Sequence, residues 1–477
     1  MGRPEPRQAP MLDLFLLAFV FAFIGSGFRR PFVFVLAYTY IDIVSPQKVS
    51  WGVLQHIPIS LIAFVCAFLA WAVADDKRGL RLSLRQVLLV ALLVYCGMST
   101  TTAEFPDNAL DKWSRVWKAL LFATFLPLTL RTRLRFEGMA LTMVLSVSVI
   151  VIGGAIKTLV SGGGYGELKL LVNDNTGLYE GSIISTVAIA VIPLAFWLAK
   201  HGTLFKPDWR VKLYAVAISF ACLLMPIGTQ ARTGLICAAV LVAMALRTAK
   251  NRFLLVGLLG VAAIVAIPVL PASFTNRMNT IGNHQADQSA STRVAVWKWT
   301  LDYVKQHPFG GGFEVYRGNK LVIDKVDVEQ DGSNVQINHE QIFDQARAFH
   351  SSYFEMLGEQ GWPGLAIWLL LHILGVIQME VVRQRFKKDA DPQSQWPENA
   401  WIAPLANALQ QAQVVYLFGS LFVGIAFQPF CYMLVGLQCG LWGYARQVRH
   451  SARPVPMVRR PRPTGRALAT EPVLAER

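Results

Sequence analysis

The sequence predicts an all-α polytopic membrane protein. Of its 477 residues, 54% are hydrophobic and only 16% are charged, whereas a soluble domain has roughly a quarter of its residues charged. The hydrophobic residues also form long runs that short polar segments separate, which is the pattern of helices that cross a bilayer. We therefore expect about twelve transmembrane helices.

The expected spans follow the hydrophobic runs in chain order. They are residues 11–27, 52–74, 86–101, 116–130, 137–159, 182–199, 211–228, 233–247, 252–270, 362–382, 412–427 and 429–445. Residues 31–44, between the first two runs, are apolar over only 14 residues. This length suits a re-entrant or interfacial helix better than a span, which needs roughly 20 residues; thirteen spans is the alternative count.

The same pattern divides the chain into four segments. We expect an N-terminal transmembrane bundle at residues 1–270, a large soluble insert at 271–361, C-terminal transmembrane helices at 362–445 and a disordered basic tail at 446–477. The insert is expected to be largely helical, since residues 291–304 and 349–359 are amphipathic at helical spacing. The polar stretch at 324–338 shows no clear regular pattern and predicts a solvent-facing loop or flap.

The placement of Lys and Arg predicts the orientation in the membrane. They gather in alternate short loops, at residues 77–85, 131–135, 206–212, 247–252 and 383–388, and such loops stay in the cytoplasm. The insert then lies outside the cytoplasm, where we expect the chemistry. The net charge of +15 reflects this topology, and it does not indicate nucleic-acid binding, which needs a basic face with interleaved aromatic residues.

No metal site or disulfide is expected. All six cysteines fall inside apolar runs, where a thiol packs as a small hydrophobic group. The sequence also has no metalloprotease motif, no nucleophile elbow and no phosphate-binding glycine loop. The first apolar run has no small-residue cleavage site after it, so it is expected to be a retained helix.

Two histidines of the insert are candidate catalytic or binding groups. His350 stands just before an amphipathic helix at the membrane edge, where a neutral imidazole can abstract a proton near neutral pH. The ordinary reading is a helix-start histidine that a backbone carbonyl satisfies. His339 is the second candidate, although solvation in its polar stretch explains it adequately.

Four arginines are candidates for binding an anion. Arg232 lies in a very short outward connection, where positive charge is disfavoured, so it either reaches lipid headgroups or forms a fork that holds a phosphate. Arg293 heads the first amphipathic helix of the insert and is by itself a weaker candidate. Arg29 and Arg30 precede the expected re-entrant helix and are added on charge and predicted outward placement alone.

The motifs around these residues resemble those of the bacterial O-antigen ligase and polymerase superfamily. Three patterns carry the resemblance: the Arg after a short polar turn (Gly228 to Gly234), the Ser-x-Arg helix that ends in Pro-Phe-Gly-Gly-Gly (Ser291 to Gly312), and His-Ser-Ser-Tyr-x-x-x-Leu-Gly-Glu-x-Gly (His350 to Gly361). The third is the most specific. Residues 30–52 also look like the start of an O-glycosylation ligase subgroup, so the resemblance covers most of residues 10–445.

The resemblance implies a metal-independent, inverting GT-C-type glycosyltransferase of the inner membrane that uses no cofactor. It would take a glycan from undecaprenyl diphosphate in the periplasm, so residues 271–361 would form a periplasmic domain. In the ligase the acceptor is the lipid A-core oligosaccharide. His350 matches the family's essential histidine, and Arg232 and Arg293 match arginines that hold the diphosphate. Further partners are membrane lipids, and no nucleic acid is expected.

Three other functions remain open at this point. A polymerase shares the fold and motifs but extends a lipid-linked glycan, and a protein O-oligosaccharyltransferase uses a Ser or Thr acceptor. A lipid-linked sugar transporter would make no bond. A transporter is expected to show internal repeats and ionisable groups at mid-membrane, and neither is evident in the sequence.

Overall fold

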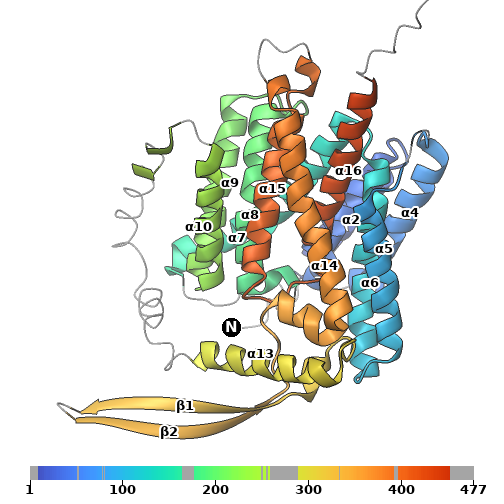
Figure 1. Cartoon of the computed structure of the whole chain (residues 1–477). Helices are drawn as coiled ribbons and strands as arrows, with labels where there is room; N and C mark the ends of the chain where they lie inside the picture. Colours follow the sequence, from blue (N-terminus) through green and yellow to red (C-terminus); the bar gives the residue numbers. More distant parts are fainter. Residues whose placement is uncertain are drawn as a thin grey trace, which may run out of the picture.

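In the computed structural model of the chain, a bundle of helices carries the insert across one of its ends (Figure 1). The structure describes residues 9–50, 53–77, 79, 81–163, 177–248, 251–253, 256–257, 288–331, 334–390 and 396–451. Most of the expected span at 252–270, the start of the insert and the tail from residue 452 lie outside these residues.

The main elements follow in chain order. The helices are α1 (Ala9–Ser26), α2 (Phe32–Val44), α3 (Pro46–Val49), α4 (Ile59–Ala74), α5 (Leu84–Thr101), α6 (Pro106–Thr129), α7 (Arg133–Ser161), α8 (Gly181–His201), α9 (Trp209–Gly228), α10 (Arg232–Thr248), α13 (Gln288–Gln306), α14 (Ser352–Arg385), α15 (Ile402–Gly419) and α16 (Pro429–Ser451). The strands are β1 (Lys320–Asp331) and β2 (Asn334–Gln345).

The described helices agree with an all-α membrane protein. Five of them, α5, α7, α8, α9 and α14, are long and apolar enough to cross a membrane, and α2, α4 and most of α1 are shorter apolar helices. Because these counts cover only the described residues, the expectation of twelve transmembrane helices stays a prediction.

The helix α8 lies in the core of the bundle. Its apolar window is 83% buried, and α7, α9, α10 and α15 pack around it. Two glycines permit close approach: a Cβ atom on Gly234 of α10 would lie 2.8 Å from Ser185, and one on Gly419 of α15 would lie 2.3 Å from Thr186. Small residues commonly bring transmembrane helices together in this way. The start of α10 and the end of α15 therefore meet beside the start of α8.

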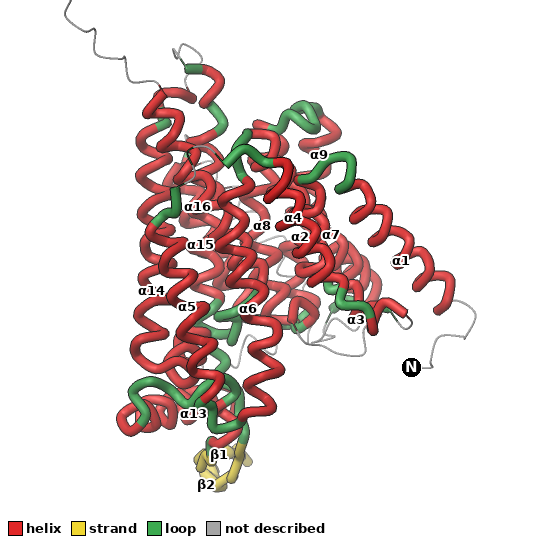
Figure 2. The backbone as a smooth tube through the Cα atoms, turned by 90° about the vertical axis from the view of Figure 1, so that its right-hand side faces the viewer, coloured by secondary structure: helices red, strands yellow, loops and turns green. Residues whose placement is uncertain are grey.

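The two ends of the bundle differ. We call the end that carries α13 and the strands the insert end, and the opposite one the far end (Figure 2). The first residue of α2, Phe32, packs under the guanidinium of Arg135, which binds Asp75 at the far end. The last residue of α2, Val44, accepts a hydrogen bond of 2.8 Å from Tyr179 at the insert end. The helix α2 therefore runs from one end of the bundle to the other, which differs from the expected re-entrant helix.

The insert contains a β-hairpin as well as helix α13. The strands β1 and β2 pair antiparallel from Lys320 opposite Gln345 to Asp331 opposite Asn334, and they extend sideways from the bundle (Figure 1). The prediction of an irregular loop at 324–338 was therefore wrong. The prediction of a largely helical insert was also wrong for the residues of these two strands. Alternation of apolar and polar residues in β1 is the missed signal, because it is the period of a strand.

A sharp break in α14 positions the residues around the insert end. Gly361 has φ 63° and ψ −167°, a conformation that is essentially restricted to glycine. A Cβ atom there would lie 2.3 Å from the carbonyl oxygen of Pro308, and Trp362 donates to the same oxygen at 3.0 Å. The Pro-Phe-Gly-Gly-Gly segment thus packs directly against the backbone of α14.

Candidate functional site

His350 is the residue that directly precedes the N-cap of α14, and its backbone is held on both sides. Before it, the carbonyl of Phe349 accepts a hydrogen bond of 2.9 Å from the Trp297 indole of α13. After it, the backbone N–H of Ser352 donates to Ser420 at 2.8 Å. His350 itself has a positive φ of 48°, which is uncommon outside glycine and is found at functional sites. The fold therefore fixes the backbone that carries this imidazole.

Two arginines act on the His350 side chain. The side chain keeps contact with solvent, while neighbouring groups desolvate it in part. This partial burial, together with the positive charges of Arg293 and Arg347, lowers the pKa of His350 below its ordinary value. The imidazole is therefore neutral near pH 7 and can accept a proton.

Arg232 and Arg293 also lie at the insert end. Arg232 is the first residue of α10 and is half-buried, beside the junction of α8 and α15 described above. Arg293 is half-buried on α13. The structure thus brings His350 and both arginines to one end of the bundle, from three elements that lie far apart in sequence. His339 lies in β2 opposite Val326.

Arg29 and Arg30 are placed elsewhere. They form the exposed turn between α1 and α2, at the far end beside Arg135 and Asp75. Their assignment to one anion site with Arg232 and Arg293 was therefore wrong. The assignment failed because it assumed that residues 31–44 begin and end on the same side of the membrane.

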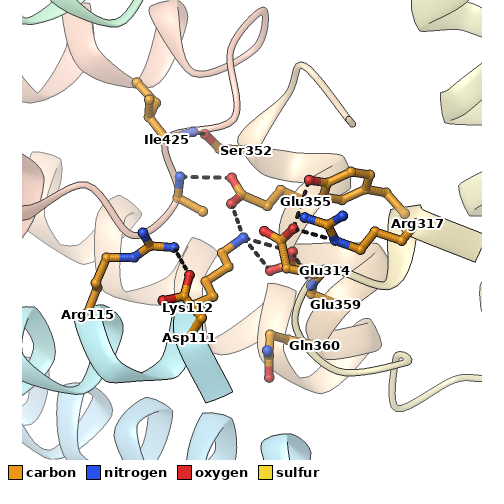
Figure 3. Close-up of polar contacts among 12 residues, drawn as sticks. Asp111, Lys112, Arg115, Glu314, Arg317, Ser352, Glu355, Glu359, Gln360 and Ile425 are labelled. Carbon is orange, nitrogen blue, oxygen red and sulfur yellow. Dashed lines mark hydrogen bonds and ion pairs between the residues drawn. The ribbon is translucent and has the colours of Figure 1, made fainter. Parts of the chain in front are cut away.

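Sequence reasoning missed a buried ion network at the insert end. The ammonium of Lys112 on α6 binds Glu355 at 2.7 Å and Glu359 at 2.8 and 2.9 Å (Figure 3). The Glu359 side chain is 0% exposed, and it also accepts the backbone N–H of Glu314 at 3.0 Å. Two glutamates at four-residue spacing on a helix more often only give solubility. Here they join α14 to α6 and to the insert.

Glu314 extends this network into the insert. It accepts hydrogen bonds from the Tyr316 hydroxyl at 2.8 Å and from Arg317 at 3.1 Å. Burial, together with the hydrogen bond to Glu314 and its negative charge, raises the pKa of Tyr316 to about 12. Tyr316 therefore stays protonated and remains a donor at neutral pH.

The described residues contain no group of three His, Cys, Asp or Glu side chains that could hold a metal ion. Metal-independent chemistry stays a prediction. Arg232 and Arg293 lie at the insert end, and the planar guanidinium of each can donate two parallel hydrogen bonds to a phosphate.

Comparison with protein families agrees with this geometry. Residues 215–369 match the O-Antigen ligase family (Wzy_C), and residues 11–203 match a family of unknown function (DUF5935). The first match contains Arg232, Arg293 and His350, and it supports the O-antigen ligase and polymerase superfamily, and hence an enzyme that acts on lipid-linked glycans in a membrane. No curated protein matches the chain.

Proposed function

We propose that this protein is an O-antigen ligase that transfers a glycan from undecaprenyl diphosphate to the lipid A-core oligosaccharide. The observation that carries the proposal is the family match over residues 215–369, which contains a histidine and two arginines that lie at one end of the bundle. A ligase is favoured over a transporter because these ionisable groups lie at helix ends and in an insert, where they can serve chemistry.

The proposed reaction uses His350 as the base. An acceptor hydroxyl donates its proton to the imidazole while its oxygen attacks the anomeric carbon of the donor sugar. The bond between that carbon and the diphosphate oxygen breaks, and the diphosphate leaves with the electron pair. Arg232 and Arg293 stabilise the charge that develops on it. Attack opposite the leaving group inverts the anomeric centre, and the reaction requires no metal or cofactor. The GT-C assignment belongs to the same proposal.

We place the insert end in the periplasm and the protein in the inner membrane. Lys and Arg of short loops stay in the cytoplasm, and the far end carries Arg29 and Arg30 as well as Arg133 and Arg135. With Arg29 and Arg30 at the far end, the excess of Lys and Arg at that end is larger than the sequence alone predicted, and the orientation rests on this excess.

Transfer assays with substituted proteins test the proposal. The purified protein is incubated with undecaprenyl-diphosphate-linked glycan and chelator, with and without lipid A-core acceptor. His350→Ala and Arg232→Ala are expected to abolish transfer while the protein remains inserted and folded. The exposed residues His56 and Arg210 offer matched controls, and their Ala variants are expected to keep wild-type activity.

The acceptor dependence separates the alternatives. Product that forms only with lipid A-core supports the ligase, and glycan lengthening without it indicates a polymerase. Transfer only to a Ser or Thr of a protein acceptor indicates a protein O-oligosaccharyltransferase. Full activity of the His350→Ala or Arg232→Ala protein would refute the assigned roles.

A further inference from the structure

A cavity of about 420 Å³ opens at the insert end, next to the ion network of Lys112. This volume lies within the range of roughly 300 to 1,000 Å³ that small-molecule sites have. Polar side chains from three parts of the chain line it: Asp42, Ser45, Gln47, Lys48 and Ser60 from the first helices, Lys112, Arg115 and Lys118 from α6, and Glu314, Glu355 and Gln428 from the second half.

One of these side chains holds an acceptor that the fold leaves unused. The Gln47 Oε1 atom is buried, and within the described residues it has no hydrogen-bond partner, whereas Asp42 bonds with the Tyr38 hydroxyl. A buried acceptor without a donor is costly. Gln47 therefore indicates a ligand group that donates a hydrogen bond inside the cavity.

The charges of the lining argue against an anionic ligand. Lys112 pairs with Glu355, Arg115 pairs with Asp111 at 2.9 Å, and Lys118 interacts electrostatically with Asp42. With Lys48 the lining has four cations, which face the three carboxylates of Asp42, Glu314 and Glu355 and, beside Arg115, that of Asp111. The charges therefore balance, and the cavity has no strong attraction for a diphosphate. It offers both donors and acceptors instead, which suits hydroxyl groups because each hydroxyl can donate and accept.

The cavity wall is tied to the residues that hold His350. The Ser352 hydroxyl donates to the carbonyl of Val423 at 3.0 Å. It also accepts from the backbone N–H of Ile425 at 2.9 Å (Figure 3). Ile425 lines the cavity, and Ser352 is two positions after His350. Residues of α6 and Ile183 near the start of α8 line the cavity, and α10, which begins at Arg232, packs against α8.

We propose that this cavity binds the uncharged sugar rings of the acceptor glycan, beside the residues that hold His350. The proposal rests on the proposed function, since it assigns one of the two substrates of that reaction. The proposal also assigns a role to residues 11–203, which match a family of unknown function, because Asp42, Gln47 and Lys112 all belong to this segment.

The test replaces two neutral lining amides, with Gln47→Ala and Gln428→Ala. Each variant is expected to raise the KM for the acceptor roughly two- to tenfold, the effect of one lost hydrogen bond, without changing kcat or the KM for the donor. The control is Gln384→Ala, which removes an exposed amide at the far end of α14 and is expected to change neither KM.

A binding measurement separates this proposal from the proposed function. Saturation-transfer NMR uses the acceptor oligosaccharide, released from its lipid, with the detergent-solubilised protein and no donor. The oligosaccharide signal is expected to persist in His350→Ala and to weaken in Gln47→Ala and Gln428→Ala. If no protein transfers glycan but the signal depends on both amides, the cavity site stands while the proposed function fails. An unchanged signal and acceptor KM in both variants, or displacement of the oligosaccharide by inorganic diphosphate, would overturn the acceptor site.

Discussion

Replacing Lys112 by Met removes the cation that holds two buried carboxylates together. At 2.7 to 2.9 Å and an effective dielectric constant of about 20, the gross attraction is roughly 6 kcal/mol for each pair. Desolvation offsets most of this attraction, but losing one partner of a buried pair still costs about 3–5 kcal/mol because it leaves uncompensated charge.

We expect a loss near the lower limit, about 3 kcal/mol, because each carboxylate keeps one backbone donor. Glu359 still accepts the N–H of Glu314 at 3.0 Å, and Glu355 still accepts the N–H of Ala426 at 3.1 Å. Adding Glu359→Gln to Lys112→Met removes one of the two stranded charges and is expected to recover a large part of the stability.

Denaturant unfolding in detergent, monitored by tryptophan fluorescence, measures both effects. Arg115→Met is the matched control, since its ion pair with Asp111 is exposed and such pairs contribute about 0–1 kcal/mol. A Lys112→Met protein as stable as the control, or a double variant no more stable than Lys112→Met alone, would show that the network does not hold α6 to α14.

Three further predictions concern the insert end and its opposite. Arg293→Gln removes a charge that lowers the pKa of His350, so this pKa should rise and the acid limb of the pH–rate profile should move to higher pH. An acid limb at the same pH would show that Arg293 does not act on the pKa of His350. Replacing both Arg29 and Arg30 by Gln should leave the transfer rate within about twofold of wild type, because they lie at the far end. A decrease above about tenfold would show that these arginines take part in transfer. Gly361→Ala should lower stability by at least about 1–3 kcal/mol of backbone strain, and an unchanged thermal midpoint would contradict the tight contact with residues 308–312.

Hydropathy and charge alone predicted much of the fold. The apolar runs at 182–199 and 362–382 correspond to α8 and to the second part of α14, and the order of cationic loops placed His350, Arg232 and Arg293 at one end. The error over Arg29 and Arg30 has a physical origin. A helix of 13 residues rises only about 20 Å, less than the hydrocarbon thickness, so length favoured a helix that returns to its own side.

The ion network could not be predicted because its partners are distant in sequence. Lys112 and Glu355 are 243 positions apart, and nothing local distinguishes this lysine from the other cations of α6. The β-hairpin, in contrast, had a visible signal. Val326 and Val328 alternate with acidic residues, and the dipeptide Gly332-Ser333 is typical of two-residue hairpin loops.

The network around Lys112 also limits how this protein can be recombined. Its cation lies in one matched segment, residues 11–203, and its carboxylates lie in the other, residues 215–369. A chimera that joins the first half of one homologue to the second half of another would bury unmatched charge unless both parents keep the same arrangement. The two halves are therefore expected to be inherited together, and swapping acceptor preference between homologues should require the exchange of α6 and the start of α14 as a unit.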